Sequence, residues 1–247
     1  MDLSELLSSG NLNLALLKLR EAIESNPSKE NYELLGRILL ELGRDDEALD
    51  AFLKAEDYIT AAKILSLKDP RSALTLLEKV SVNESKLMRA MIFMRMEKYD
   101  EALKELGSMD SINENPLFFK VKGIAEFYTD RIYEAMRDLS RGILLYPLDA
   151  DLYYYRALVR IRLGDEDNAE KDLDIAINLN PYYAEAYLNK GLIAERRGDI
   201  NKAISMYSKS ISIRPNYKEA YIRRSGAYSK IGRDEEAKSD LEKSSQL

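Results

Sequence analysis

The chain has 247 residues, with 37 Lys and Arg against 43 Asp and Glu, a formal net charge of -6, and 45% hydrophobic residues. This composition is sufficient for a buried core, and because Cys and His are both absent, disulfides, thiolate or imidazole catalysis and Cys/His zinc sites are excluded. The acidic balance argues against a nucleic-acid protein of the usual basic kind.

The charge is unevenly distributed along the chain. Residues 1 to 115 hold 15 basic and 22 acidic side chains, whereas residues 116 to 247 hold 22 and 21, which suggests that the two halves meet different partners. At the N-terminus, Asp2 and Glu5 stand where a secretory signal requires Lys or Arg, and no apolar run approaches the roughly 20 residues of a membrane span. We therefore expect a cytoplasmic protein.

The first half is predicted to consist of irregular helical hairpins. Its recurring alanines are separated by 33, 25, 29 and 33 residues and are Ala15, Ala48, Ala73, Ala102 and Ala135. Two of these hairpins are therefore short, and the one over residues 57 to 80 is expected to turn at Asp69 and Pro70. Residues 107 to 116 are the expected loop between an irregular half, residues 1–115, and a regular half, residues 116–247.

A period of 34 residues organises the second half. One register carries Ala135, Ala169, Ala203 and Ala237, another Pro147, Pro181 and Pro215, and a third Phe119, Tyr153, Tyr187 and Tyr221. Two further registers hold small residues (Gly123, Ala157, Gly191, Ser225) and turn residues (Asp130, Gly164, Gly198, Gly232). Repetition at this period predicts stacked copies of one supersecondary unit.

Each unit is predicted to be a pair of helices. In residues 184 to 217, apolar positions recur every three and four residues both before and after Gly198. Gly198 supplies the turn, Asp199 stands at the N-cap position of the second helix, and Pro215 ends that helix because the residue before a proline is disfavoured in the helical region.

This unit resembles the tetratricopeptide repeat. The pattern of that family is matched by Tyr187, Gly191, Gly198, Ala203, Tyr207, Ser210 and Pro215. The match recurs in units starting near residues 116, 150, 184 and 218, and about four looser units precede them. The resemblance implies an all-α fold, a right-handed α-solenoid of about eight stacked helical hairpins, in which the first helices line a concave face.

The last unit is expected to act as a C-terminal cap. Ile143, Ile177 and Ile211 recur at 34 residues, but the next place in this register holds Ser245, and Ile204 is followed by Lys238. A terminal repeat requires a polar outer face, so this substitution pattern predicts the end of the stack.

Two charged patterns are interpreted as structural. The acidic residues between Asp165 and Asp174 lack the glycine and terminal glutamate of an EF-hand loop and fit the first turns of a helix, where carboxylates complement the helix dipole. Lys122, Arg156 and Arg224 are each followed sixteen residues later by an aspartate, Asp138, Asp172 or Asp240, which predicts ion pairs across the hairpins. We therefore expect no metal site, no cofactor and no catalysis.

The sequence predicts a non-catalytic scaffold or adaptor that binds a peptide or partner protein, because stacked repeats form a long continuous surface. A self-associating structural module is one alternative. A helical-repeat RNA binder is another, favoured by Arg156, Arg160 and Arg162 and disfavoured by the net charge. The identity of the partner and the oligomeric state do not follow from the sequence.

The predicted peptide-binding residues follow the presumed concave registers of the second half. Apolar and aromatic groups come first and cationic or amide groups follow: Ile124, Phe127, Tyr128, Tyr154, Tyr155, Leu158, Asn189, Arg196, Arg223 and Lys230. This gradient predicts a ligand with apolar anchors and acidic residues.

Some tetratricopeptide repeat proteins bind the C-terminal carboxylate of chaperones through a clamp of Lys, Asn, Asn, Lys and Arg. The corresponding positions are Tyr154, Leu158, Asn189, Glu219 and Arg223. Only Asn189 and Arg223 match, and Glu219 would repel a carboxylate, so this pattern argues against chaperone-tail binding.

Overall fold

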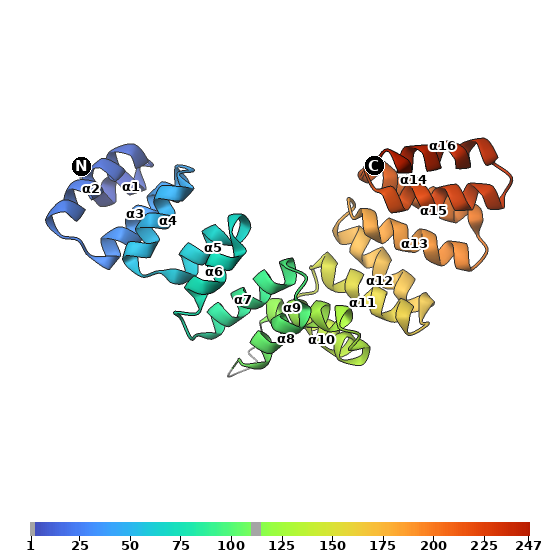
Figure 1. Cartoon of the computed structure of the whole chain (residues 1–247), viewed down its shortest axis with the longest axis horizontal. Coiled ribbons are helices and arrows are strands. Elements are labelled where there is room, and N and C mark those ends of the chain that lie inside the picture. The colour runs from blue at the N-terminus through green and yellow to red at the C-terminus, as the bar shows by residue number, and fades with distance from the viewer. Residues whose placement is uncertain (1–2, 110–114) are drawn as a thin grey trace. The chain divides into compact units, whose positions relative to one another are not determined.

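The computed structural model describes residues 3–109 and 115–247, in which the chain forms sixteen α-helices and no strands. The chain divides into two compact units, Met1–Ser111 and Ile112–Leu247. Consecutive helices pair as antiparallel hairpins, and each hairpin packs on the next one in its unit (Figure 1). The predicted all-α solenoid of helical hairpins is confirmed.

The first unit contains eight helices in four hairpins. They are α1 (Leu3–Ser8), α2 (Leu12–Ser25), α3 (Lys29–Glu41), α4 (Asp45–Ala55), α5 (Tyr58–Lys68), α6 (Pro70–Leu77), α7 (Asn83–Arg95) and α8 (Tyr99–Gly107). Helices α6 and α8 have only 8 and 9 residues, as the short alanine intervals predicted. The turn at Asp69 and Pro70 is also confirmed, since Asp69 caps α6 by accepting a hydrogen bond from the Ser72 amide.

The second unit contains eight longer helices. They are α9 (Pro116–Tyr128), α10 (Ile132–Leu145), α11 (Ala150–Arg162), α12 (Glu166–Leu179), α13 (Ala184–Arg196), α14 (Ile200–Ile213), α15 (Lys218–Lys230) and α16 (Asp234–Ser245). The predicted loop over residues 107 to 116 contains residues 110–114, which lie outside the described residues.

The turns of the second unit use the left-handed backbone region. Gly164, Gly198 and Gly232 have φ values of +78°, +82° and +72°, and Asp130 takes the same role at +61°. Asp199 caps α14 as predicted, with Oδ1 accepting from the Lys202 amide at 3.0 Å. These local signals set the hairpin boundaries because only a few residue types tolerate a positive φ.

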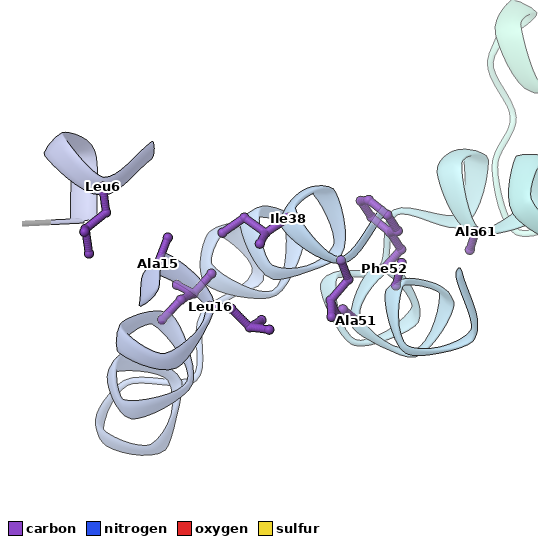
Figure 2. Close-up of a cluster of buried hydrophobic side chains, with 10 residues drawn as sticks. Leu6, Ala15, Leu16, Ile38, Ala51, Phe52 and Ala61 are labelled. Carbon is purple, nitrogen blue, oxygen red and sulfur yellow. The ribbon is translucent and has the colours of Figure 1, made fainter. Parts of the chain in front are cut away.

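The core of each unit lies between the helices of a hairpin and between adjacent hairpins. In the first unit, one buried cluster extends from α1 to α5 and includes Leu6, Ala15, Ile38, Phe52 and Ala61 (Figure 2). Within the described part of the second unit, three such clusters are built from neighbouring hairpins. Contacts restricted to neighbours are typical of a solenoid.

Candidate functional site

All ten predicted binding residues lie on the first helices of the four hairpins in the second unit, α9, α11, α13 and α15. We call their shared side the first-helix face. Successive first helices contribute equivalent positions because the repeat length is constant, so residues 34 apart in the sequence can meet in one surface.

An aromatic cluster forms one part of the first-helix face. The Tyr155 ring lies 6.2 Å from the Tyr128 ring and 5.3 Å from the Tyr154 ring, both in edge-on orientation. The Tyr154 ring in turn lies 4.7 Å from that of Tyr183. Such pairs stabilise by roughly 0.5–1.5 kcal/mol beyond their buried area, so the cluster is a rigid apolar platform.

Phe127 differs from its predicted role as a partner contact. Its side chain is 7% exposed, packed edge-on against Tyr128 at 5.3 Å and Tyr155 at 6.1 Å. The Arg162 guanidinium covers its ring at 4.4 Å. Phe127 therefore supports the platform from beneath, while Tyr128, 46% exposed, presents a ring to solvent. Ile124 and Leu158 are half-buried beside the same core.

Hydrogen bonds hold the polar ends of the platform. The Tyr183 hydroxyl donates to Asp151 Oδ1 at 2.9 Å, and Asp151 also binds Lys120 at 2.5 Å. Asn189 Nδ2 donates to the Tyr154 hydroxyl at 3.3 Å, which connects α11 to α13. Burial raises the pKa of Tyr154, Tyr155 and Tyr183 above the ordinary phenol value, so the three hydroxyls stay neutral at physiological pH.

A cationic pocket forms the other part of the first-helix face. It has a volume of about 260 Å³ and is lined by Leu192, Glu195, Arg196, Arg223 and Lys230 of α13 and α15. Three of the predicted residues are thus brought together around one cavity.

Each cation of this pocket already has a carboxylate partner. Lys230 binds Glu195 at 2.6 Å, and Glu195 also accepts from the buried Tyr207 hydroxyl. Arg196 binds Glu166 at 2.9 Å, and Arg223 binds Glu219 at 2.6 Å one turn away on α15. The face is therefore less cationic than the sequence suggested. The prediction followed the positions of the three cations along the repeats and did not take their carboxylate partners into account.

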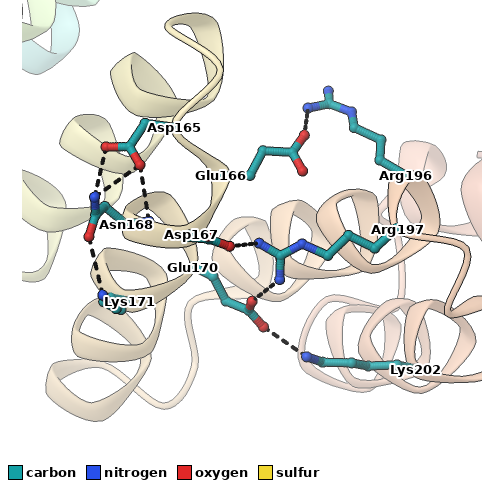
Figure 3. A network of polar contacts seen from close by, with 9 residues as sticks. All are labelled: Asp165, Glu166, Asp167, Asn168, Glu170, Lys171, Arg196, Arg197 and Lys202. Atoms are coloured by element: carbon teal, nitrogen blue, oxygen red, sulfur yellow. Dashed lines mark hydrogen bonds and ion pairs between the residues drawn. The ribbon is translucent and has the colours of Figure 1, made fainter.

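The acidic residues at the start of α12 have structural roles. Asp165 caps the helix through Asn168, and Asp167 and Glu170 bind Arg197 at 2.7 and 2.5 Å (Figure 3). Glu170 also binds Lys202 at 2.8 Å. Figure 3 shows these contacts joining α12 to α13 and α14. Among the described residues, no group of three or more acidic side chains is placed to hold a metal ion.

The predicted ion pairs across the hairpins are all present. Lys122 lies 2.6 Å from Asp138, Arg156 2.8 Å from Asp172, and Arg224 2.7 Å from Asp240. Arg156 and Arg224 also reach back to Ser140 and Ser208 of the preceding hairpin. Arg156 and Arg224 therefore act as struts, meaning that each one connects two successive second helices through its side chain.

The contacts of two residues, Lys190 and Tyr183, were not predicted from the sequence. Sixteen residues after Lys190, where the other basic residues have their aspartate, the chain has Met206. Lys190 instead binds Asp174, which lies sixteen residues earlier on the preceding hairpin. Tyr183 joins the aromatic platform from the turn before α13. A signal existed for the tyrosine, since Tyr183 and Tyr217 are 34 residues apart, but both precede the first helix and lie outside the helical registers.

Comparison with known proteins identifies the repeats. Three models described as tetratricopeptide repeat match residues 4–62, 184–217 and 218–247. The chain belongs to the tetratricopeptide repeat family. The members of this family are generally protein-interaction scaffolds, and the matched segments of this tetratricopeptide repeat chain lie in both of its compact units.

Solved structures share the fold of this tetratricopeptide repeat chain. A crystal structure of MamA is 24% identical over 68% of this chain and 94% of its own, with a TM-score of 0.57. The structure of the APC/C hetero-tetramer Cut9-Hcn1 contains a chain that is 19% identical, with a TM-score of 0.70 over 91% of this chain and 48% of that one. No curated protein matches the sequence significantly. Within the described part of the chain, no helix is both long and apolar enough to cross a membrane.

Proposed function

We propose that the chain is a non-catalytic scaffold that binds a partner segment along the first-helix face of its second unit. The supporting observation is that the half-exposed aromatic platform and the cationic pocket lie on the first helices of consecutive hairpins, with Asn189 connecting α11 to α13. Rigid aromatic groups next to arginine are typical of binding hot spots. The ligand is therefore a segment with apolar side chains and acidic residues.

The cations differ in how readily they can exchange partners. Arg223 and Glu219 form an exposed pair one helical turn apart, a type of pair that stabilises by only about 0.3–0.5 kcal/mol. Glu195 is more firmly held, because both Lys230 and Tyr207 bind it. We therefore expect Arg223 to turn from Glu219 to an acidic side chain of the partner at little cost.

Two substitutions test the first-helix face. A partner captured with the wild-type chain and then purified is titrated against Tyr155→Ala and Arg223→Glu. Each variant is expected to lose at least about 1 kcal/mol of binding free energy, the usual threshold for a significant interface residue. Tyr155→Ala removes the centre of the platform, and Arg223→Glu repels an acidic ligand.

Matched controls come from the second helices. Tyr133 and Arg141 of α10 are exposed and lie off the first-helix face, so Tyr133→Ala and Arg141→Glu should bind like the wild type. If Tyr155→Ala and Arg223→Glu also remain within about 0.5 kcal/mol of the wild type, below a hot-spot effect, then the partner binds elsewhere.

A further inference from the structure

A pocket larger than the cationic one lies in the first unit. It has a volume of about 550 Å³ and lies between the second helices α2 and α4, with α3 behind them. Its apolar lining consists of Ile23, Tyr32, Leu35, Leu39 and Ala51. Leu39 and Ala51 are buried, whereas Ile23, Tyr32 and Leu35 keep part of their surface open.

The ion pair that crosses the equivalent seam in the second unit is missing at this pocket. In the second unit, Arg156 fills the seam between α10 and α12 by binding Ser140 and Asp172. In α3, the residue before the small Gly36 is Leu35, and the residue sixteen positions later is Ala51. Two apolar side chains thus replace both members of the ion pair, and a leucine is too short to span the seam.

The rim of the pocket is acidic. Glu24, Asp46, Glu47 and Asp50 lie on it, against the cations Arg20 and Lys54. Three of these carboxylates have cationic partners: Glu47 binds Arg20 at 2.9 Å and Arg44 at 2.6 Å, Asp50 binds Lys54 at 3.3 Å, and Asp46 binds Lys68 at 3.0 Å. Glu24 has no partner among the described residues.

This excess of acidic groups extends through the surrounding sequence. The first 60 residues hold 13 acidic and 6 basic side chains, which accounts for the negative charge of the whole chain. A field of this sign attracts cationic partners and repels acidic ones.

We propose that the pocket between α2, α3 and α4 binds a basic segment of a protein partner. An aliphatic or aromatic side chain of that segment enters between Ile23, Tyr32 and Leu35. Its flanking Lys or Arg residues pair with Glu24 and the other rim carboxylates. Both requirements follow from the surface itself, since the opening is apolar and its rim is acidic.

Three labelled nine-residue peptides serve as probes in fluorescence polarisation with the full chain. One has central leucines flanked by lysines, the second has alanines in place of the leucines, and the third has glutamates in place of the lysines. The lysine–leucine peptide is expected to bind at least tenfold more tightly than either of the others. If the lysine–alanine peptide binds as tightly as the lysine–leucine peptide, charge alone accounts for the affinity and the proposal is overturned.

The decisive variant restores the strut. Leu35→Arg combined with Ala51→Asp copies the pair formed by Arg156 and Asp172 and closes the seam, so the lysine–leucine peptide should bind at least tenfold more weakly. Glu24→Gln should weaken it about threefold, whereas Glu21→Gln, exposed on the same helix outside the pocket lining, should leave it unchanged. Far-UV circular dichroism and thermal unfolding verify that each variant is folded.

Further measurements separate this pocket from other binding surfaces. Tyr155→Ala and Arg223→Glu in the second unit should leave the affinity for the lysine–leucine peptide at the wild-type value. Loss of peptide binding in those variants, or full binding by the folded Leu35→Arg and Ala51→Asp double variant, would place the peptide elsewhere. Sedimentation that shows a dimer abolished by the double variant would identify the pocket as a contact between copies and would also overturn the proposal.

Discussion

At the scale of single residues, the charged pairs differ in how deeply they are buried. The Asp172 side chain is 2% exposed and lies 2.8 Å from both Arg156 and Arg160. A buried carboxylate that loses a cation keeps its desolvation cost without full compensation. We expect Arg156→Met to lower the free energy of unfolding by about 1–3 kcal/mol in urea titrations, with Arg160 limiting the loss.

An exposed pair provides the comparison. Arg37 and Glu33 form an ion pair one turn apart on α3, and their side chains are 68% and 40% exposed. Arg37→Met should change the free energy of unfolding by no more than about 0.5 kcal/mol, the usual range of such pairs. Similar losses for Arg156→Met and Arg37→Met would show that burial does not decide the strength of these contacts.

Glu126 is a buried acid with an unsatisfied oxygen. The residue is 3% exposed, and its Oε2 atom has no hydrogen-bond partner among the described residues. Burial, and then the negative charge of Asp138, raise the pKa of Glu126 to about 7, although Lys122 and Arg137 oppose this. The folded chain therefore holds a proton on Glu126 at pH values where the unfolded chain has released it.

This pKa shift has a definite sign for stability. Since the folded pKa lies above the unfolded value of 4.5, the free energy of unfolding should fall as the pH rises from about 4.5 to about 7. Glu126→Gln removes the titration, so urea titrations at pH 5 and pH 8 should differ less than in the wild type. Glu134→Gln, exposed on α10, should retain the wild-type difference, and an unchanged difference in Glu126→Gln would contradict the assignment.

Asp138 does not obscure this measurement. Burial raises its pKa, but hydrogen bonds and charges from Arg137 and Lys122 outweigh burial, and the net shift is downward from 3.8. The stability that Asp138 contributes is therefore present above pH 3.8 and is lost only as the pH falls through its folded pKa, below the window set by Glu126.

At the scale of elements, the helices of a hairpin approach each other over small residues. A Cβ added to Gly191 of α13 would lie 2.3 Å from Cε1 of Tyr207, which is fully buried on α14. Gly191→Ala should therefore lower the free energy of unfolding by about 1–3 kcal/mol through overpacking, despite the better helix propensity of alanine. Gly226→Ala on α15, where no atom lies within 4 Å, should instead gain about 0.5–1 kcal/mol.

A second substitution tests whether the Tyr207 ring is the cause. In the preceding hairpin, Ala157 faces a second helix that has Leu173 at the place of Tyr207, and both are fully buried. Tyr207→Leu should therefore reduce the cost of Gly191→Ala in a double-mutant cycle. Additive effects of the two substitutions would rule out a direct contact between these positions as the source of the loss.

At the scale of the whole molecule, the second unit is expected to fold by itself. Among the described residues, three of its core clusters draw their residues from the segment between α9 and α16, and repeat proteins depend on contacts between neighbours. A fragment of residues 115–247 should show the far-UV circular dichroism of a helical protein and a cooperative thermal transition. An unfolded fragment would show that the second unit requires the first.

Much of the fold could be predicted because hairpin structure is encoded locally. The signals that define a hairpin, such as the turn at Gly198 and the cap at Asp199, lie within one 34-residue repeat. Each repeat therefore specifies its own pair of helices. The ion pairs of Lys122, Arg156 and Arg224 could be predicted for the same reason. Both partners belong to one hairpin of fixed geometry, and sixteen residues always connect the same two positions.

The tertiary structure decided which groups meet between hairpins. Lys190 turns back to Asp174 because Met206 cannot accept an ion pair, Arg162 of the next hairpin covers Phe127, and Arg196 binds Glu166 of the preceding hairpin. The pocket beside Leu35 likewise depends on which side chains cross the seam between α2 and α4. A periodic sequence fixes where each backbone position lies, whereas side-chain length, charge and burial across the seams determine whether a position becomes core, strut or binding surface.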